Sequence, residues 1–327
     1  MKNIIIIGGG IASYALIPKL SYRENKIFLV DGDEYYPSCS ENSTAINCLR
    51  GIKKGISPLG DLLYDSHHEF LKFYQAYRPN GVYKGIEQIF FNQDDLQLIK
   101  RYPEHQKVDE KCLVKNKDYY VQLEAYFWNF QLFKTWVKEN FDFELLQDYV
   151  KTINNNELSL HKNGVVNFDH VYCCTNNTNN YYAKFNHDYE IYRSKLKSVK
   201  GSFLETNYNC EFSSSTSIKV DGVHYIFRKE DKILQIGSTS EQSDHFIHSK
   251  TELDSMYENT KQRLNISIPK RESFNYKTGI RQKGAKRLPF WGPVAPNIDI
   301  VNGLYKNGFS FAFMAAKELT KCRNSSS

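Results

Sequence analysis

The sequence has no long apolar run. No stretch of its 327 residues approaches the ~20 apolar residues of a membrane-spanning helix. The apolar run near the start, Ile4 to Ile7, meets glycines at once and is too short for a signal peptide. The sequence therefore predicts a soluble, cytoplasmic protein that does not associate with a membrane.

Several classes of site also lack their motifs. The seven cysteines are odd in number and contain no C-x-x-C pair, which excludes a disulfide framework and a zinc cluster. This cysteine usage favours a reducing compartment. The nine histidines have no Cys or carboxylate placed to complete a metal shell, so we expect no metal site. The G-x-S-x-G motif of serine hydrolases is missing as well.

Charge of one sign is not concentrated in any segment. The chain has 43 Lys and Arg against 37 Asp and Glu, a net charge of +6, without a long run of like charges. A mildly basic protein can favour an anionic partner, such as a carboxylate substrate or a nucleic acid. Because Lys, Asn and Ile are abundant throughout, a general compositional bias is the simpler explanation.

Length and aromatic content indicate a globular chain with two domains. Its 327 residues exceed the ~250 residues at which a single core usually stops growing. Aromatic residues make up 14% of the chain, which is ample bulk for folding.

A dinucleotide-binding motif opens the chain. A β-branched apolar strand ends at Gly8, and a helical apolar pattern follows through Leu20. The spacing G-x-G-x-x-G falls on Gly8, Gly10 and Ser13. The first glycine permits a tight turn, and the second lets the backbone approach a pyrophosphate. The amides at the N-terminus of the helix would then face the phosphates.

Three more residues bear on this motif. Asp31 ends the next strand, 21 residues past Gly10, where a carboxylate can accept hydrogen bonds from ribose hydroxyls. Ser13 replaces the third glycine, and Pro18 should kink the helix. A glycine-rich turn of another α/β fold is the alternative. The strand before, the helix after and the acid at the second strand's end favour the dinucleotide site.

The remaining sequence does not read as a plain NAD dehydrogenase, because no alternating βα units follow Asp31. The expected helices cover 58–77, 124–141 and a segment opened by a capping box at 251–254. The expected strands form hairpins around 162–164 and over 225–238, and a buried strand over 170–174. A strand, a glycine-bounded loop and a helix end the chain.

Five blocks, taken in order, resemble the D-amino acid oxidase family of flavoproteins, which contains glycine oxidase and sarcosine oxidase. These blocks are IIIIGGGIAS, SCSENSTA, HYIFRKEDKILQIGSTSE, GIRQKGAKRLPFWG and GLYKNGFSFAF. The resemblance implies an α/β fold in which a Rossmann-like FAD-binding domain (GR2-type) is interleaved with an antiparallel-sheet α+β substrate domain. The FAD-binding domain would comprise 1–62, 140–182 and 276–327, and the substrate-binding domain 63–139 and 183–275.

The resemblance also implies FAD as the cofactor. No Cys has the context of the covalent attachment in sarcosine oxidase, so FAD is expected to bind noncovalently. Thr175 and Asn176 stand where family members usually have a small residue and glycine, and Lys286 stands where an Asp is common. The residues expected to contact FAD are Gly8, Gly10, Ile11, Ala12, Asp31, Ser40, Asn42, Ser43, Thr44, Val150, Thr175, Gly279, Gly303, Tyr305, Lys306, Asn307, Gly308 and Phe309.

Two residues are implied to act on the substrate. Arg281 would clamp a substrate carboxylate, because its planar fork matches two oxygens and stays charged. Tyr225 would direct its hydroxyl toward the substrate. The flavin itself accepts the hydride, so no catalytic acid or base is obligatory. On the residues alone, a surface or interdomain ion pair for Arg281 and a packing role for Tyr225 remain open.

Three functions follow as hypotheses. The first is an FAD-dependent oxidase or dehydrogenase of a small carboxylate-bearing primary or secondary amine, such as an amino acid or an N-substituted glycine, whose imine product water hydrolyses. The second is the oxidase that acts on the carboxymethylaminomethyl group of a tRNA wobble uridine, because the spacing of Arg281, Leu288, Pro289 and Gly292 also resembles that enzyme. The third is a flavin-binding interaction module without catalysis.

Overall fold

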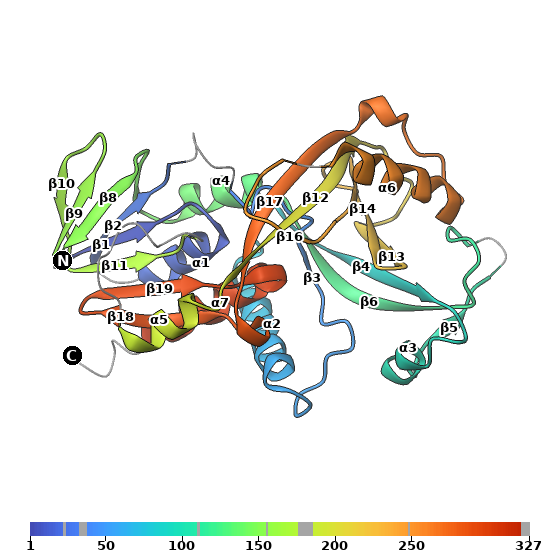
Figure 1. Cartoon of the computed structure of the whole chain (residues 1–327), viewed down its shortest axis with the longest axis horizontal. Helices are drawn as coiled ribbons and strands as arrows, with labels where there is room; N and C mark the ends of the chain where they lie inside the picture. Colours follow the sequence, from blue (N-terminus) through green and yellow to red (C-terminus); the bar gives the residue numbers. More distant parts are fainter. Residues whose placement is uncertain are drawn as a thin grey trace.

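The protein has two lobes that lie side by side, and β1 and α7, the first and last elements described, both belong to the first lobe (Figure 1). The structure is a computed structural model and describes residues 1–21, 24–32, 38–109, 112–154, 156–175, 186–247 and 249–321. The first lobe is built on a six-stranded sheet, and the second on a ten-stranded sheet. Within these described residues, no helix is both long and apolar enough to cross a membrane.

The first sheet is mostly parallel and has the order β18-β19-β11-β1-β2-β7. Its members are β1 (Lys2–Ile7), β2 (Asn25–Val30), β7 (Glu144–Leu146), β11 (His170–Cys173), β18 (Phe290–Ala295) and β19 (Ile298–Asn302). Five of these strands run parallel, and β18 pairs antiparallel with β19 at the edge. The carboxyl ends of β1, β2, β11 and β19 therefore meet at one edge, which is where ligands bind in open α/β sheets.

Alternating isoleucines in β1 bury both faces of this sheet. Ile4 and Ile6 pack in one core with α1 (Ile11–Leu20), α4 (Phe130–Asn140) and α7 (Gly308–Lys321). Ile5 and Ile7 point to the opposite face, as strand geometry requires. That face is covered by α5 (His187–Arg193) and by a three-stranded sheet of β8 (Val150–Asn154), β9 (Glu157–Leu160) and β10 (Val165–Asn167).

The second sheet carries one long helix on its outer face. Its strands are β3 (Ile46–Asn47), β4 (Val82–Phe91), β5 (Gln106–Lys107), β6 (Tyr119–Trp128), β12 (Lys197–Asn207), β13 (Thr216–Val220), β14 (Val223–Arg228), β15 (Ile233–Gly237), β16 (Glu241–Gln242) and β17 (Asn275–Lys283). Helix α6 (Lys250–Arg263) lies on the outer face, where Leu253 and Tyr257 pack with Leu204, Ile218 and Ile236 (Figure 1). The short helix α3 (Leu96–Arg101) lies near the tip of β4.

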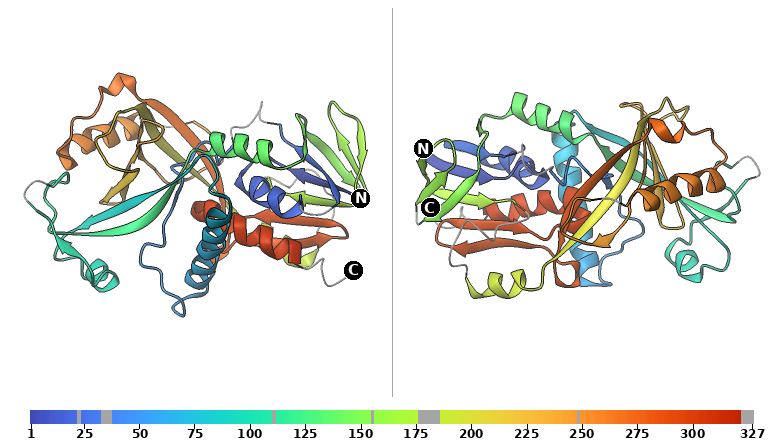
Figure 2. Two further views of the ribbon diagram at one scale, coloured as in Figure 1. Left: turned by 180° about the vertical axis from the view of Figure 1, so that it is seen from behind. Right: turned by 45° about the horizontal axis from the view of Figure 1, so that its top comes forward.

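Helix α2 (Pro58–Tyr77) lies beside α7 at the junction of the lobes (Figure 2). Phe70 of α2 packs 5.5 Å from Phe313 of α7 and 5.5 Å from Trp128 at the end of β6, measured between ring centres. Aromatic packing of this kind adds to the free energy of burial. It holds the helix that begins at Gly308 against both sheets.

Several expectations are confirmed. The helix expected over 58–77 has those bounds, because Ser57 caps its N-terminus by accepting a hydrogen bond from the Gly60 amide. The strand expected over 170–174 is β11, and the two hairpins are β9-β10 and β14-β15. Helix α1 continues through Pro18 and ends two residues later, at Leu20.

Two expected helices have different bounds. The segment 124–141 is not one helix: residues through Trp128 belong to β6, and α4 begins at Phe130 after Asn129 caps it through the Leu132 amide. The third helix begins at Lys250, where Ser249 and not Thr251 accepts the capping hydrogen bond from Glu252. Both N-caps are short polar side chains, as helix starts require.

The lobes also divide the chain differently from the expected domain segments, as β3, β17, α4 and α5 show. Strand β17 was expected in the FAD-binding domain, but it pairs along its whole length with β12 of the second sheet. Helix α4 was expected in the substrate-binding domain, but Phe130, Phe133 and Val137 pack in the core of the first lobe. The last segment of chain therefore passes from the second sheet back to the first.

Candidate active site at the junction of the lobes

The first turn of the chain has the shape expected for a dinucleotide loop. Gly8 follows β1 with a φ of +98°, and a Cβ there would lie 2.7 Å from Cγ2 of Thr175 and 3.3 Å from the Cys174 carbonyl group. Gly10 is the N-cap of α1. Only glycine fits at position 8, because the backbone conformation and the close approach both exclude a side chain. The loop therefore turns sharply from the end of β1 into the N-terminus of α1.

Ser13 compensates for the missing third glycine. It is fully buried in the first turn of α1, and its hydroxyl donates a hydrogen bond to the Gly8 carbonyl oxygen. The neighbouring Ile11 and Ala12 are buried as well. The serine ties the start of the helix to the glycine turn, so the departure from the motif leaves the turn in place.

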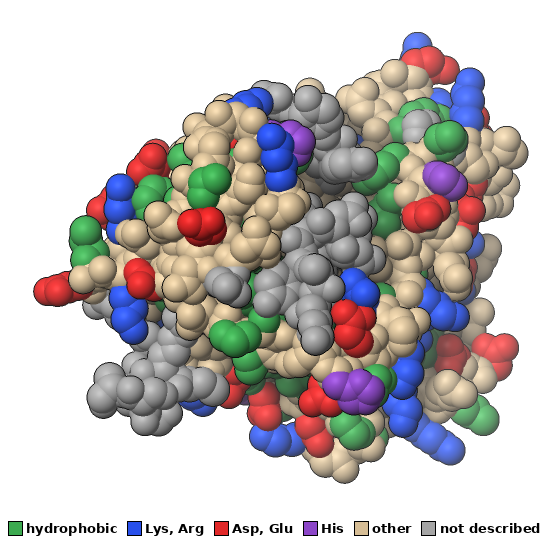
Figure 3. Space-filling view, turned by 60° about the vertical axis from the view of Figure 1, so that its left-hand side comes forward, with side chains coloured by type: hydrophobic (Ala, Val, Ile, Leu, Met, Phe, Trp, Pro, Cys, Tyr) green, Lys and Arg blue, Asp and Glu red, His purple; other side chains and the backbone are tan. Residues whose placement is uncertain are grey.

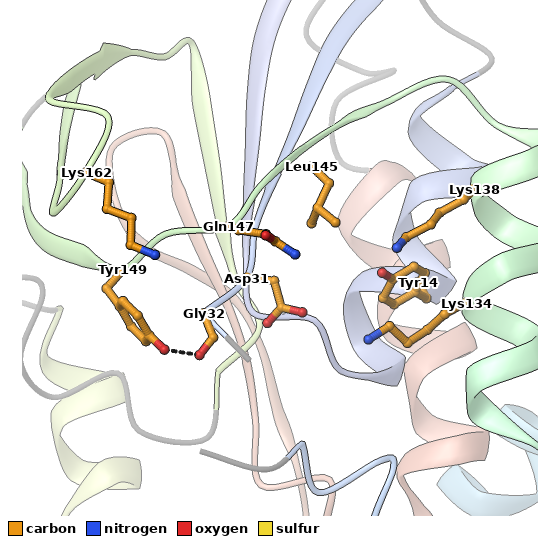
Figure 4. A pocket seen from close by; sticks show the side chains of 9 residues that line it. All are labelled: Tyr14, Asp31, Gly32, Lys134, Lys138, Leu145, Gln147, Tyr149 and Lys162. Carbon is orange, nitrogen blue, oxygen red and sulfur yellow. Dashed lines mark hydrogen bonds between the residues drawn. The ribbon is translucent and has the colours of Figure 1, made fainter. Parts of the chain in front are cut away.

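Asp31 lies at one end of a cavity beside the glycine turn (Figure 4). Its Oδ1 accepts a hydrogen bond of 3.0 Å from the Gly9 amide. The cavity is also lined by Tyr14, Gly32, Lys134, Lys138, Leu145, Gln147, Tyr149 and Lys162. Val150 follows Tyr149 and is buried in the core beneath this cavity. A carboxylate at the end of the second strand fits the ribose of a dinucleotide.

The loop at Ser40 contacts both lobes. The Ser40 hydroxyl accepts a hydrogen bond of 3.0 Å from the Ile11 amide, at the N-terminus of α1. On the other side, a Cβ on Gly279 would lie 2.7 Å from the Asn42 carbonyl oxygen. Glycine at 279 thus lets β17 approach the loop. Ser43 and Thr44 complete the loop before β3, and the Ser43 hydroxyl donates to the Ser40 carbonyl oxygen at 3.3 Å.

The chain returns to this place after β19. Gly303 has a φ of +70°, and Tyr305 to Asn307 form a 3-10 turn before α7 begins at Gly308. A Cβ on Gly308 would lie 3.8 Å from the side chain of Ile11, so the starts of α7 and α1 are neighbours. The expected FAD contacts of the first, second and last blocks therefore converge at one edge of the sheet.

Two more expected contacts line the same region. The Phe309 carbonyl oxygen accepts a hydrogen bond of 2.8 Å from the Asn47 side chain, which links α7 to β3. Asn307 lines a second cavity together with Arg50, His67 and Ser310. This cavity lies between α2, the segment around β3 and the N-terminus of α7. Asn176, which was expected to alter the approach to the flavin, lies outside the described residues.

Arg281 points its side chain from β17 into this junction. Its Nε and Nη2 atoms are buried and make no hydrogen bond to any residue that the structure describes. The guanidinium lies 5.5 Å from the ring centre of Tyr305. On the neighbouring strand β12, a Cβ on Gly201 would lie 2.2 Å from Nη2, so only glycine leaves room for the guanidinium. A buried cation without a partner calls for an anionic ligand.

Tyr225 does not lie in this site, which corrects the expectation for it. The side chain is fully buried on the outer face of the second sheet, in the core that contains Phe227 and Leu253 of α6. Side chains alternate along β14, so His224 and Ile226 face the inner side instead. The tyrosine beside Arg281 is Tyr305, which was expected only as a cofactor contact.

A buried ion pair on the inner face of the second sheet was missed from the sequence. Arg50 donates two hydrogen bonds to Glu87, at 2.6 and 3.0 Å, and His224 lies 3.2 Å from the same carboxylate. Although burial opposes it, the Arg50 guanidinium holds the pKa of Glu87 well below its usual range. Arg50 and Glu87 are 37 residues apart and belong to no recognisable motif, so no sequence signal connected them.

The Cys39 thiol, which lies within range of the Arg281 charge, is protonated and therefore not a nucleophile at neutral pH. Burial raises the pKa of Cys39 to about 11, and the charge of Arg281 offsets that rise only in part. Burial also raises the pKa of Cys48 to about 12, with Glu87 adding to the rise. Both side chains are therefore neutral thiols at neutral pH. Within the described residues, no group of His, Cys, Asp or Glu is arranged to hold a metal ion.

Residues 145–322 match the family described as DAO, FAD dependent oxidoreductase. The chain belongs to this family. FAD is therefore its cofactor. The glycine turn, the Asp31 carboxylate and the neighbouring N-termini of α1 and α7 fit that dinucleotide. Membership makes this chain an FAD-dependent oxidoreductase and not an interaction module without catalysis. No curated protein matches the sequence.

Solved structures share the fold across the whole chain. Glycine oxidase from Bacillus cereus ATCC 14579 aligns with a TM-score of 0.74 at 14% identity, over 100% of this chain and 96% of that one. Iminodiacetate oxidase from Chelativorans sp. BNC1 gives 0.72 at 12% identity, over 98% and 95%. L-alpha-glycerophosphate oxidase from Mycoplasma pneumoniae, with FAD bound, gives 0.76 at 13% identity, over 99% and 94%. These likenesses confirm the expected fold class.

Proposed function

We propose that this enzyme oxidises the C–N bond of a primary or secondary amine that carries a carboxylate. The observation that supports this most directly is the buried guanidinium of Arg281, whose Nε and Nη2 have no hydrogen-bond partner among the described residues. A carboxylate is the planar partner that matches two such donors. Arg281 lies on β17 two residues past Gly279. Gly279 in turn lies against Asn42, in the loop of expected FAD contacts that begins at Ser40.

The protein's task in this reaction is to position the substrate. Bound FAD supplies the hydride acceptor, and the imine that results is hydrolysed by water. Arg281 would hold the carboxylate of the substrate, and the absence of a side chain at Gly201 leaves room for its guanidinium. Holding a reactive geometry can contribute several kcal/mol, on the order of ~7 in favourable cases. The strand carrying Arg281 is paired with β12 over nine residues, so the anchor is rigid.

The test compares Arg281→Met and Arg281→Lys with a control, Arg271→Met. Arg271 also stacks on a tyrosine, 4.5 Å over the ring of Tyr276, but it pairs with Asp254 on the outer side of the second sheet. We expect Arg281→Met to bind FAD normally and to lose at least about a hundredfold in kcat/KM, the cost of a charge-assisted pair. The lysine variant should recover part of this loss.

The control should keep the activity of the unsubstituted enzyme. An Arg281→Met protein that carries FAD and oxidises amines with unchanged kcat/KM would refute the carboxylate clamp. The comparison with Arg271→Met separates the loss of a specific anchor from the general loss of one arginine.

A tRNA carrying an N-carboxymethylated amine on its wobble base is the second candidate substrate. Arg281 could bind that carboxylate as well, and the net charge of +6 would favour a polyanion. On the face shown in Figure 3, however, basic and acidic side chains of the described residues are interspersed. The candidate predicts tRNA binding that weakens steeply with salt. A gel-shift titration at low salt that detects no complex would contradict the tRNA hypothesis.

A further inference from the structure

Arg281 is one of three cations that surround the ring of Tyr305. The Arg281 guanidinium, the Lys283 ammonium and the Lys306 ammonium lie 5.5, 5.8 and 5.6 Å from the ring centre. Arg281 and Lys283 are two residues apart on β17, so their side chains leave the same face of the strand. Lys306 comes from the turn after β19, which meets β17 through a bridge between Lys283 and Leu304.

These cations have no counterion within the part of the chain that the structure describes. No carboxylate lies within ion-pair distance of Arg281, Lys283 or Lys306 there. The one fully buried carboxylate of this inner face, Glu87, is bound by Arg50. Like charges that converge without a counterion are unfavourable, and more so where water is partly excluded.

The pKa values of Lys306 and Lys219 reflect this repulsion. Partial burial lowers the pKa of Lys306; Tyr305 opposes this fall, and the charges of Arg281 and Arg287 add to it. Burial likewise lowers the pKa of Lys219, on the inner face of β13, with Arg50 and Lys306 among the contributing charges. The charge of Lys306 is thus one of several that act on Lys219.

One substrate carboxylate would leave most of this charge unbalanced. A carboxylate that binds the fork of Arg281 satisfies its Nε and Nη2, while Lys306, which is exposed beside the Tyr305 ring, is left available for a second anion. We propose that the substrate carries a second anionic group, a carboxylate or a phosphate, which Lys306 binds while Arg281 holds the first carboxylate. This inference rests on the proposed function and specifies its substrate class: a dianionic amine.

Unreactive ligands test the second site without catalysis. The holoenzyme is titrated with acetate, succinate and phosphonoacetate at constant ionic strength, and binding is followed as the perturbation of the flavin absorption spectrum. We expect both dianions to bind about ten- to a hundredfold more tightly than acetate, the range for one charge-assisted hydrogen bond. Comparing the affinity for succinate with that for phosphonoacetate shows whether the second group is a carboxylate or a phosphate.

Variants assign the preference to Lys306. Lys306→Met should remove the preference for dianions, measured as the ratio of the dianion affinity to the acetate affinity in the same protein, whereas Lys306→Arg should keep this ratio. Lys317→Met is the control, because Lys317 lies on α7 but pairs with Glu69 of α2. If Lys306→Met fails to retain FAD, Lys219→Met is expected to reduce the same preference.

The outcomes separate this inference from the proposed function. Equal affinities for acetate and the dianions in the unsubstituted enzyme, or a preference that survives in Lys306→Met, would overturn the second site. Acetate binding that is lost in Arg281→Met would still support the carboxylate clamp in that event. Acetate binding that is unaffected by Arg281→Met would instead overturn the proposed function.

Discussion

Gly201 and Arg281 face each other on neighbouring strands, so closely that a methyl group on Gly201 would lie 2.2 Å from Nη2 of Arg281. The residues that pair directly in this register are Gly201 with Gly279 and Val199 with Arg281. The guanidinium therefore reaches across to β12 and lies over Gly201, two residues past Val199, its own pairing partner. It occupies space that any other residue at 201 would fill.

Gly201→Ala should displace the guanidinium without removing its charge. A contact of 2.2 Å cannot persist, so Arg281 must move away from the carboxylate position, and a 1 Å misplacement can cost on the order of ~100-fold. We expect kcat/KM for carboxylate-bearing amines to fall by about that factor, mainly through KM. Steady-state kinetics measure the change. A variant with bound FAD and unaltered KM would show that the position of Arg281 does not matter.

Gly8→Ala should abolish FAD binding. Position 8 has a φ of +98°, which costs an alanine on the order of ~1–2 kcal/mol, and its Cβ would also meet the Cys174 carbonyl group. The purified variant should be colourless, with less than about a tenth of the flavin content of the unsubstituted enzyme. Gly222→Ala is the matched control, because Gly222 has a φ of +79° in the turn between β13 and β14 and nothing lies within 4 Å of its Cβ. Retention of full flavin content in Gly8→Ala would contradict the assigned nucleotide turn.

Tyr225→Phe should leave catalysis unchanged. The Tyr225 hydroxyl is buried on the outer face of the second sheet and has no hydrogen-bond partner among the described residues. Removing an unsatisfied buried hydroxyl should raise the free energy of unfolding by about 1 kcal/mol. Kinetics and urea denaturation check the two expectations separately. A large fall in kcat would contradict this assignment and show that Tyr225 takes part in catalysis.

His67 should make the fold sensitive to mild acid. Burial, together with the charge of the neighbouring His68, lowers the pKa of His67 from 6.5 to about 4. Between these values the unfolded chain binds a proton that the folded chain does not, so stability falls as the pH decreases from 6.5 toward 4. His67→Gln should remove this part of the pH dependence, measured by urea denaturation at several pH values. An identical slope in both proteins would show that His67 does not contribute.

Local signals predicted the parts of the fold that local interactions determine. Helix α2 combines a helical apolar period with Ser57 and Pro58 at its start, so its bounds could be predicted from the sequence. The glycine turn was predictable because the sequence has a glycine at position 8, where the backbone needs a positive φ, and an acidic residue after the second strand. The split of 124–141 into strand and helix was not predictable, because its aromatic residues suit either period.

The site itself depends on strand register and on contacts between distant segments. Tyr225 was placed on the wrong face because a strand has two faces, and only the packing of α6 shows which one is outer. Lys306 and Lys283 were not connected to Arg281 as a group, because the bridge between Lys283 and Leu304 joins the end of β17 to the turn after β19, which is distant in the sequence. The sequence therefore predicted most members of the site but not their grouping.

Anaerobic reduction of the bound flavin tests the central claim most directly. The oxygen-free holoenzyme is mixed in turn with amino acids, N-alkyl glycines, their dianionic analogues and the same amines without a carboxylate. We predict that the flavin absorbance near 450 nm is bleached by carboxylate-bearing amines and fastest by dianionic ones, because the substrate's hydride moves to the flavin. A flavin that stays oxidised with every carboxylate-bearing amine, or is bleached equally by amines without one, would contradict the proposed function.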